Sequence, residues 1–529
     1  MRNFSVFLAT AIAFLNGYMT SAQEAQKADT IPLQEVVVSG SRIETGRNRI
    51  PVSVSVLTRD EVKRIDRSNI LPEISDRIPG VFVTERGMTG FGVSKGAAGQ
   101  ILIRGVGGVS PNNQVLVLID GHPQYMGIFG HPLPDAYVAS DIEKVEVVKG
   151  PASVLYGSAA MAGVVNIITR RLQAEGPSLS ARVSYGSFNT QKYMVNGGYR
   201  WKKFGVFASV NRDHTDGERD SSVFDITNGF VKLSWDPSPH LSVSANVMAA
   251  AFTSQDPGPI FQPASFWVDI KRGQTALSIE NKFEKTQGGF TVFYNFGKHV
   301  LADGWHSRDG QAGISLYQGV SLFRGNRLTA GIDYKNTGGI GNSGMNHDKW
   351  LAMDETAGYL FAQQQLFGQV NLSGGLRLEN NSIYGSEWVP QAGATWNPGR
   401  LTTLRVSASK GFRNPTIKNL IICIQKIAAC HKHFGKFHHL PRNPDIQYSK
   451  ILLQPGVTFS RKLCVKTADR LTVQRNRKFF IFPHRSAKNL MLRGGQYQIL
   501  HMQIAVSGTP AQPGRNHSRN LEFHTLILH

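Results

Sequence analysis

The chain has 529 residues and a formal net charge of +21, and its length suggests more than one folded unit. The charge does not indicate a nucleic-acid partner, because Ile421–His529 holds 17 Lys+Arg against 3 Asp+Glu, a net of +14, without basic and aromatic residues interleaved on a recognisable nucleic-acid-binding fold. Residues 1–420 hold the other 41 Lys+Arg and 34 Asp+Glu, a net charge of +7. They contain no cysteine, which suits an exported protein without a disulfide framework.

The first 22 residues have the pattern of a cleaved secretory signal peptide. Arg2 supplies the positive start, Phe4–Leu15 is a mostly apolar stretch, and Thr20–Ala22 offers small residues before Gln23. A membrane anchor is the alternative, but the apolar stretch is shorter than the roughly 20 residues that a spanning helix needs. No later segment reaches that length, so a membrane protein of this composition would span as a β-barrel.

Residues 23–172 predict a short tether followed by a small α+β domain. The polar stretch 23–45 contains one apolar strand-forming segment, Leu33–Val38. Helical spacing predicts helices over Arg59–Ile65 and Ile70–Ile78, the second ended by Pro79-Gly80. Apolar runs bounded by turn residues predict strands at Val52–Leu57, Ile101–Gly105, Val115–Asp120, Val145–Val148 and Val164–Ile168.

Residues 177–420 alternate apolar and polar side chains. In Leu241–Val247, for example, Leu, Val, Ala and Val alternate with Ser, Ser and Asn. Such segments, separated by Gly, Asn, Asp and Pro turns, are what a barrel with lipid outside and water or a plug inside requires. A soluble β-sandwich has the same alternation, but the signal peptide favours the membrane. Aromatic residues near strand ends suggest interfacial girdles: Tyr185, Tyr199, Trp201, Trp235, Phe252, Tyr294 and Phe296.

The number of strands that fit between Pro177 and Leu420 is small. At about 10 residues per strand plus turns, the segment holds roughly 11 to 13 strands, whereas a barrel wide enough to hold a folded domain in its lumen has about 22. An unclosed sheet in lipid leaves backbone groups unpaired, at several kcal/mol each. We therefore expect an incomplete antiparallel barrel and a defective or truncated copy.

The segment 421–529 breaks the preceding pattern. It holds nine of the chain's 16 histidines and all three cysteines, and its acidic residues almost vanish. A metal site at Cys423, Cys430, His433 and His438 is one interpretation, but the spacings match no usual zinc framework. A DNA-binding or disordered basic tail is another. We favour a tail that is translated out of frame and therefore irregular.

Ile142–Arg170, which reads IEKVEVVKGPASVLYGSAAMAGVVNIITR, carries the most specific signal. Together with ILIRG at residue 101, and with Trp388–Pro398 and Ser409–Thr416 later in the chain, it resembles the TonB-dependent outer-membrane receptors over residues 33–420. The resemblance implies a mainly β protein, with an α+β plug at 46–172 and a transmembrane β-barrel at 177–420. It also implies a transporter rather than an enzyme, without a cofactor, located in the outer membrane.

The resemblance assigns a role to the N-terminal strand-forming segment. In the family such a segment, the TonB box, adds as a strand to the periplasmic partner that supplies energy, the TonB–ExbB–ExbD complex. The alternative is an ordinary first strand of the plug, for which Val52–Leu57 is the better candidate. The predicted box residues are Leu33, Gln34, Glu35, Val36, Val37 and Val38.

The resemblance also implies a plug–barrel latch. Arg104 and Lys149 match positions where the family carries basic residues that bind barrel glutamates, and Glu146 and Glu379 are the candidate acidic partners. The family's usual residue at the second position is Arg. Lys149 keeps the charge but lacks the planar bidentate fork, so we expect a weaker latch.

The candidate ligand surface is Asp120–Tyr137, since plug loops in the family meet the substrate. His122, Tyr125, Met126 and His131 could contact a metal chelate, and His, Tyr and Met are all competent haem ligands. The alternative is that they pack the plug against the barrel wall, as the three prolines of the loop suggest. A ferric siderophore is the expected cargo, with haem or cobalamin as alternatives. A non-transporting outer-membrane binding or adhesion protein and a soluble periplasmic enzyme are the rival classes.

Overall fold

The computed structural model describes residues 36–63, 68–84, 100–107, 114–130, 132, 136–342, 350–399, 402–419, 497–508, 520–521 and 526–528. These residues belong to one compact unit, Val36–His529. The predicted signal peptide, box residues Leu33–Glu35, ligand candidate His131 and most of the tail after residue 419 lie outside this set. Within it, no helix is long and apolar enough to cross a membrane.

The N-terminal domain is built around a five-stranded sheet in the order β3-β8-β9-β6-β7. Only the β6–β9 pair is parallel, and the other three pairs are antiparallel. Every residue of β6 is buried, which explains why this strand is a continuous apolar run rather than an alternating one. The strands are β3 Ser53–Leu57, β6 Val115–Ile119, β7 His122–Pro123, β8 Ile142–Lys149 and β9 Gly163–Thr169.

Short elements surround this sheet, and the predicted helices are confirmed with closer bounds. Helix α2 spans Arg59–Lys63, and α3 spans Leu71–Arg77 with Pro72 in its first turn. Proline is tolerated there because the first turn's N–H groups have no intrahelical partner. The remaining elements are β1 Val36–Val37, β2 Thr45–Gly46, η1 Arg47–Arg49, β4 Val81–Val83, β5 Ile101–Ile103, η3 Ala139–Asp141 and α4 Ser153–Tyr156.

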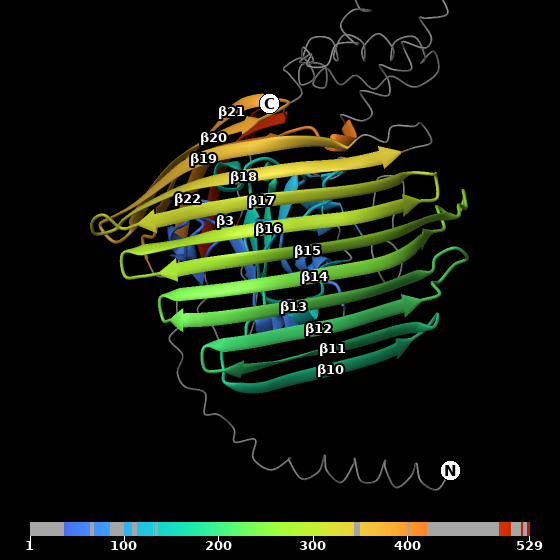
Figure 1. Ribbon diagram of the computed structural model, residues 1–529. Helices are drawn as coiled ribbons and strands as arrows, with labels where there is room; N and C mark the ends of the chain where they lie inside the picture. The colour runs from blue at the N-terminus through green and yellow to red at the C-terminus, as the bar shows by residue number, and fades with distance from the viewer. Residues whose placement is uncertain are drawn as a thin grey trace, which may run out of the picture. The chain divides into compact units, whose positions relative to one another are not determined.

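Thirteen consecutive antiparallel strands, β10 to β22, form the large sheet (Figure 1), which confirms the expected 11 to 13. Each pairs with the next in the chain, as in an up-and-down barrel wall. They are β10 Gly176–Gly186, β11 Thr190–Trp201, β12 Phe204–Thr215, β13 Phe224–Ser238, β14 Leu241–Asp256, β15 Phe266–Lys282, β16 Thr286–Leu301, β17 His306–Val320, β18 Asn326–Asn342, β19 Leu351–Leu366, β20 Val370–Asn381, β21 Gly385–Trp396 and β22 Thr402–Arg413.

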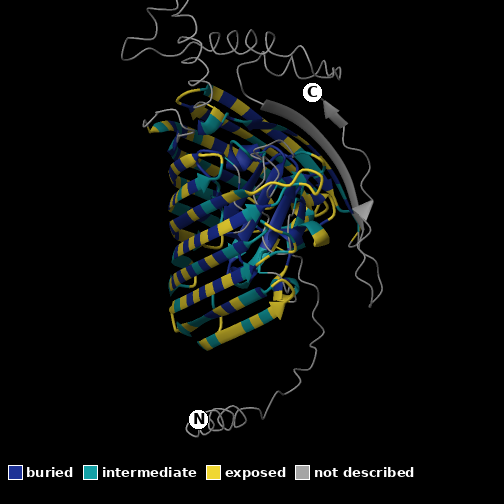
Figure 2. Ribbon diagram, turned by 90° about the vertical axis from the view of Figure 1, so that its right-hand side faces the viewer, coloured by how far each residue is buried: buried dark blue, intermediate teal, exposed yellow. Residues whose placement is uncertain are grey.

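Burial alternates along these strands, and its sense is inverted relative to a soluble protein. On β13, Val231, Leu233 and Trp235 are exposed, whereas Lys232 and Ser234 between them are buried. Figure 2 shows the alternation as stripes of buried and exposed residues along the strands. Apolar side chains outside and polar side chains inside are the arrangement of a transmembrane barrel.

The large sheet continues into the tail at one end and has an open edge at the other. Strand β23, Tyr497–Gly508, pairs with β22 along its whole length and is followed by β24, Asn520–Leu521, and β25, Leu526–Leu528. The sequence QILHMQIAVS has the two-residue period of a strand, so the expected irregular tail is wrong for these residues. At the other end, β10 pairs only with β11 among the described strands, so its outer edge is open there.

Contacts of the N-terminal domain define the two ends of the wall. Where β15 and β21 end, Lys282 pairs with Glu44, and Asn397 donates a hydrogen bond to the Asn48 carbonyl. We call this the tether end. At the opposite ends of the strands, the loop Pro123–Gly130 contacts the wall, with Gly127 donating to Asp309. We call this segment the apex loop and this side the apex end.

Candidate functional site

The first described residues are held against the plug by a buried carboxylate. The backbone N–H groups of Val38 and Ser39 both donate to Oε2 of Glu146, at 2.9 and 2.8 Å. Lys144 Nζ lies 2.7 Å from the other oxygen of Glu146 and also donates to the Val36 carbonyl at 3.2 Å. Val37 is fully buried. The predicted box residues Val36–Val38 are therefore docked on strand β8.

The docked segment does not belong to the main plug sheet. Val36 and Val37 pair with Gly46 and Thr45 in a separate two-stranded ribbon, while Val52–Leu57 supplies the edge strand β3. Such a small ribbon has little stability by itself, so its position depends on the polar contacts to β8.

Arg42 extends this docking to the barrel wall. Its Nε and Nη2 atoms donate to the Leu155 carbonyl at 3.1 and 2.8 Å, and its guanidinium carbon lies 4.2 Å from the centre of the Tyr156 ring. Nη2 also lies 3.8 Å from Asp333 on β18. We call Val38, Ser39, Arg42, Lys144 and Glu146 the tether clasp.

Behind Arg42, the interior of the wall carries a network of buried charges. Asp333 accepts a hydrogen bond from Arg377 at 2.7 Å, and Arg377 also donates to Glu379 at 2.8 Å. Lys335 pairs with Glu355 at 2.8 Å. Buried charges are tolerated when they are paired in this way, and removing one partner is costly.

Glu379 touches the plug at a glycine. A Cβ added at Gly157 would lie 2.3 Å from Glu379 Oε2, and Gly157 has φ +75°, so both space and backbone conformation require glycine here. The Tyr156-Gly157 turn of the motif segment thus brings plug backbone directly against the charged network of the wall.

The predicted latch residues make different contacts from those expected. Arg104 Nη1 donates to the Lys149 carbonyl at 3.1 Å, and Lys149 Nζ donates to the Pro79 carbonyl at 3.3 Å, so both contacts lie within the plug. Glu146 belongs to the tether clasp, and Glu379 pairs with Arg377 of its own strand. Glu379 lies at the interface between plug and wall, where it faces Gly157.

Three of the four predicted ligand residues belong to the described part of the chain, and these three lie on β7 and the apex loop, against the wall. His122 is buried and stacks on Phe293 with ring centres 5.4 Å apart. Burial lowers the pKa of the His122 imidazole to about 4. Tyr125 is half-buried, and its hydroxyl accepts a hydrogen bond from Gln311. Met126 is buried among apolar side chains of several strands.

The rest of the apex loop contacts aromatic and charged groups that were not among the predicted site residues. The Gly127 N–H donates to Asp309 at 2.8 Å, and the same carboxylate is held by Arg272. Phe129 packs against His299 and Trp305. The inward positions of Arg272 and Asp309 could have been found by following the apolar/polar alternation along their strands, since a charged residue at an inward position needs a partner inside the wall.

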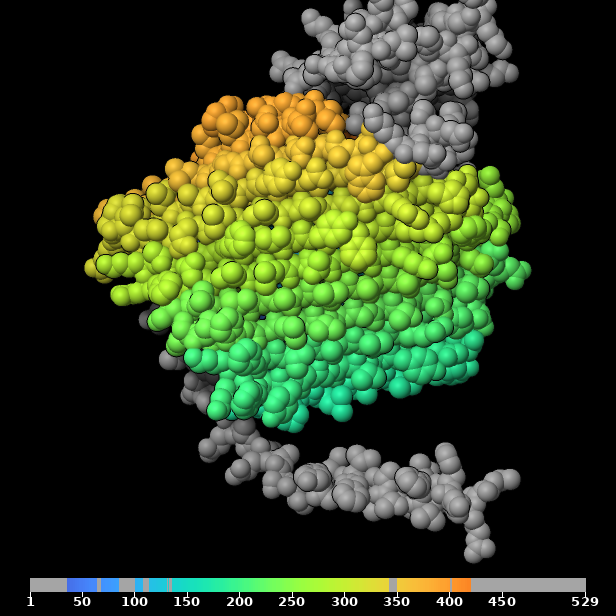
Figure 3. All heavy atoms as spheres, in the orientation of Figure 1, coloured from blue at the N-terminus to red at the C-terminus, as the bar shows by residue number. Residues whose placement is uncertain are grey.

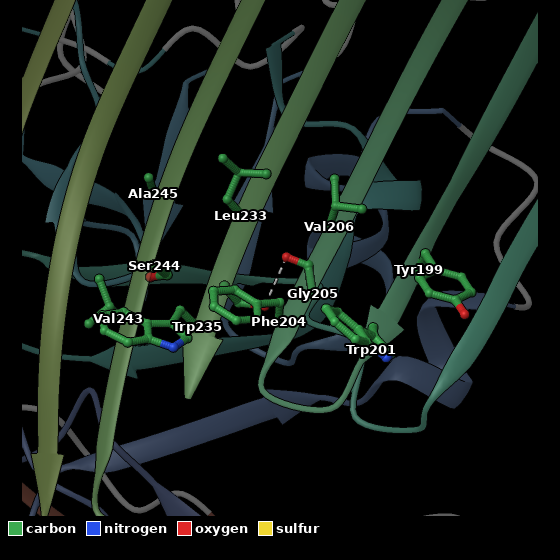
Figure 4. A pocket seen from close by; sticks show the side chains of 11 residues that line it. Tyr199, Trp201, Phe204, Gly205, Val206, Leu233, Trp235, Val243, Ser244 and Ala245 are labelled. Carbon is green, nitrogen blue, oxygen red and sulfur yellow. Dashed lines mark hydrogen bonds between the residues drawn. The ribbon is translucent and has the colours of Figure 1, made fainter. Parts of the chain in front are cut away.

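The outer face carries aromatic residues at the tether end, as the predicted girdle requires. Tyr199, Trp201, Phe204 and Trp235 line a shallow groove (Figure 4), and all four are exposed. Phe252 was also expected in a girdle, but it is buried inside against Phe224, because its position on β14 has the inward parity. No group of three or more His, Cys, Asp or Glu suited to a metal occurs in the part of the chain that the structure describes.

Comparison with known proteins agrees with this architecture. The TonB-dependent receptor plug domain matches residues 47–164, and the TonB-dependent receptor-like β-barrel matches residues 267–424. The chain is 25% identical over 472 residues to the iron-regulated outer membrane virulence protein of Vibrio cholerae serotype O1, covering 78% of this chain and 64% of that protein. It is 32% identical over 200 residues to the vitamin B12 transporter BtuB of Vibrio vulnificus, covering 36% of this chain and 29% of that protein.

Solved structures share the fold at lower identity. The siderophore receptor PirA from Pseudomonas aeruginosa superposes with a TM-score of 0.58 at 17% identity, covering 86% of this chain and 72% of that one. The ferric yersiniabactin uptake receptor FyuA from Yersinia pestis superposes with a TM-score of 0.60 at 13% identity, covering 87% of this chain and 70% of that one. The plug and barrel matches together span more than half of the sequence, and the chain belongs to the TonB-dependent receptor family.

Proposed function

We propose that the protein is an outer-membrane receptor of the type that imports a ferric siderophore or a similar metal-bearing nutrient with energy from the TonB–ExbB–ExbD complex, and that this copy of it is defective. One observation carries the proposal. A strand-forming segment near the N-terminus is docked by a few polar contacts on a plug that packs inside a membrane-type wall. The iron-regulated Vibrio relative and the siderophore receptors of similar fold favour an iron chelate as cargo.

The tether clasp supplies a mechanism for coupling. Strand addition to a periplasmic partner needs free backbone donors and acceptors, and in the docked state the N–H groups of Val38 and Ser39 are occupied by Glu146. Release of these two bonds frees the segment for a partner strand. Arg42 joins the same segment to Asp333 of the wall, so a force on the segment reaches the plug–wall interface.

We propose Tyr125 as the residue of the apex loop that meets the ligand, because it is half-buried whereas His122 and Met126 are buried against the wall. The latter two would contact a ligand only after the loop leaves the wall. His131, which lies outside the described residues, stays a proposed contact. Arg104, Glu146, Lys149 and Glu379 stay a proposed plug–barrel latch, in which Glu379 beside Gly157 supplies the wall side.

Haem and cobalamin remain alternative cargoes, the second favoured by the similarity to a vitamin B12 transporter over 200 residues. A passive binding or adhesion protein of the same fold is the alternative class. Deleting Glu35–Val38 from a version with the intact reading frame separates these functions: we expect binding of an iron chelate to persist and energised uptake to fall to background. Retained uptake would reject the box assignment. Binding without uptake in the intact chain, with the energising complex present, would favour the passive protein.

We also propose that the chain is exported by a cleaved signal peptide, and that translation leaves the family's reading frame near residue 420. The change in charge, His and Cys usage at residue 421, close to the end of the barrel match at 424, supports the second point. Strand β23 is a reason to test it, because its alternation suits a barrel strand. Resequencing the gene around codon 420 is the test, and in-frame homologues of 421–529 would reject the frame change.

A further inference from the structure

Three cations lie side by side on the outer face of the wall, toward the apex end. Lys271 on β15 is directly opposite Lys298 on β16, which is directly opposite Arg308 on β17. All three side chains are exposed and have the outward parity of their strands. Directly opposed residues of antiparallel strands have Cβ atoms about 5 Å apart, and like charges in that position destabilise a sheet.

No carboxylate neutralises this row among the residues that the structure describes. None of the three cations takes part in a hydrogen bond or ion pair there, although Asp269 faces outward two positions from Lys271 on the same strand. By contrast, Arg212 on the outer face of β12 pairs with Asp225 at 2.9 Å. The row is therefore a concentration of unpaired positive charge on a surface that otherwise faces lipid.

A shallow groove lies next to the row. Its floor is made by small outward-facing residues that lie two positions from the row toward the tether end. Gly229 is opposite Ala249, which is opposite Gly273, which is in turn opposite Phe296. Phe296 lies over Gly273, since a Cβ there would be 2.4 Å from its ring, and it stacks on Tyr294. Trp350 closes the far side over Gly338. The face that holds this groove is turned to the viewer in Figure 3.

Small residues flanked by aromatic rings make the floor of the groove apolar, and the three cations line its side toward the apex end. Acyl chains beneath phosphate groups match this arrangement, because the chains fill the channel and the phosphates neutralise the row. The site lies at the apex end, opposite the tether that engages a periplasmic partner, and so in the outer leaflet. This placement rests on the proposed function.

We propose that Lys271, Lys298 and Arg308 bind the phosphate groups of a phosphorylated glycolipid of the outer leaflet, with an acyl chain in the groove over Gly229, Ala249 and Gly273. Arg308 supplies a planar fork suited to phosphate, and the two lysines act as point charges. Near a membrane surface, each basic residue contributes about a fivefold gain in affinity for anionic lipid. The row as a whole then contributes about 100-fold.

The test measures lipid binding by the full chain, refolded into vesicles of phosphatidylethanolamine that contain bisphosphorylated lipid A or the same lipid A without phosphates. Copurifying lipid is counted by native mass spectrometry. We expect the parent chain to retain phosphorylated lipid A, and the Lys271→Gln, Lys298→Gln, Arg308→Gln triple variant to bind it about 100-fold more weakly. A chain with Lys271→Arg and Lys298→Arg, which keeps the positive charges, should bind it as the parent chain does.

Lys202→Gln with Lys203→Gln is the matched control, since it removes two exposed cations at the tether end. We expect it to leave lipid A binding unchanged. Equal binding of phosphorylated and dephosphorylated lipid A, or wild-type binding by the triple variant, would overturn the proposal. A chain that fails to insert into either vesicle would also overturn it, whereas lost iron uptake with retained lipid binding would count only against the proposed transport.

Discussion

The tether clasp and the apex loop are both plug segments held in place inside the same wall, but by different forces. The clasp uses buried charges and two backbone hydrogen bonds to one carboxylate. The apex loop depends mainly on apolar packing by Met126, Ile128 and Phe129, with Asp309 as its polar anchor. Polar contacts of this kind can be exchanged for a partner's strand or for water, whereas apolar packing resists release until something replaces the buried surface.

The largest effect on the free energy of unfolding should come from removing a buried side chain of the apex loop. Phe129→Ala removes a buried ring that contacts His299 and Trp305, and we expect a loss of about 3 to 5 kcal/mol in the free energy of unfolding of the plug. Urea denaturation at low and high salt measures it, and the loss should not depend on salt. Phe283→Ala, at an exposed ring, is the control. A loss below about 1 kcal/mol would show that packing does not hold the loop.

The second effect is a pH dependence at the strand preceding the apex loop. Burial places the folded pKa of His122 at about 4, below its ordinary 6.5, so the unfolded chain binds more protons between these values. Stability from this group is complete above pH 6.5 and is lost as the pH falls toward 4, by about 3 kcal/mol in all. His122→Phe should abolish this loss.

Asp141 provides an internal check on that measurement. Burial raises the pKa of its carboxyl to about 6, so its contribution to stability falls as the pH rises from 3.8 to 6, the opposite sense. Once His122 is replaced, the free energy of unfolding measured by urea denaturation should fall as the pH rises from 4 to 6, in the sense that Asp141 requires. An unchanged profile in His122→Phe would mean that the imidazole is not buried in its neutral form.

The smallest effect is expected at the tether clasp. Glu146→Gln keeps an acceptor oxygen for Val38 and Ser39 but removes the ion pair with Lys144, at a cost of about 1 to 1.5 kcal/mol. A cysteine introduced by Val37→Cys, at a fully buried position, should then react about 10-fold faster with a maleimide. Glu143→Gln, which removes an exposed partner of Arg59, is the control and should leave the rate unchanged.

The clasp measurement also tests the contrast between the two regions. Because the clasp is held by charge, raising the salt concentration should speed maleimide labelling of the parent Val37→Cys chain and narrow its difference from the Glu146→Gln variant. Salt-independent labelling in both chains would mean that docking of the segment is governed by packing, as at the apex.

Much of the fold could be predicted because each element carries a local signal. The two-residue period identified the wall strands and their number, and the apolar runs of the plug identified β6, β8 and β9. Strand β23 has the same period but was overlooked, since the composition of the tail around it drew attention to charge and histidine content instead. Phe252 was misplaced because its parity on β14 was not followed from Leu241 onward.

By itself, the sequence determined the family, the plug and the inside–outside pattern of the wall, because local periodicity and a contiguous motif encode them. Only the tertiary structure decided which charges meet. Glu146 binds the N-terminal segment rather than the barrel, and Arg42 reaches Asp333 across nearly 300 positions of the chain. The same holds for the row of Lys271, Lys298 and Arg308, which depends on strand register. The partner of a charge depends on which backbones come together in space, and no local pattern specifies that.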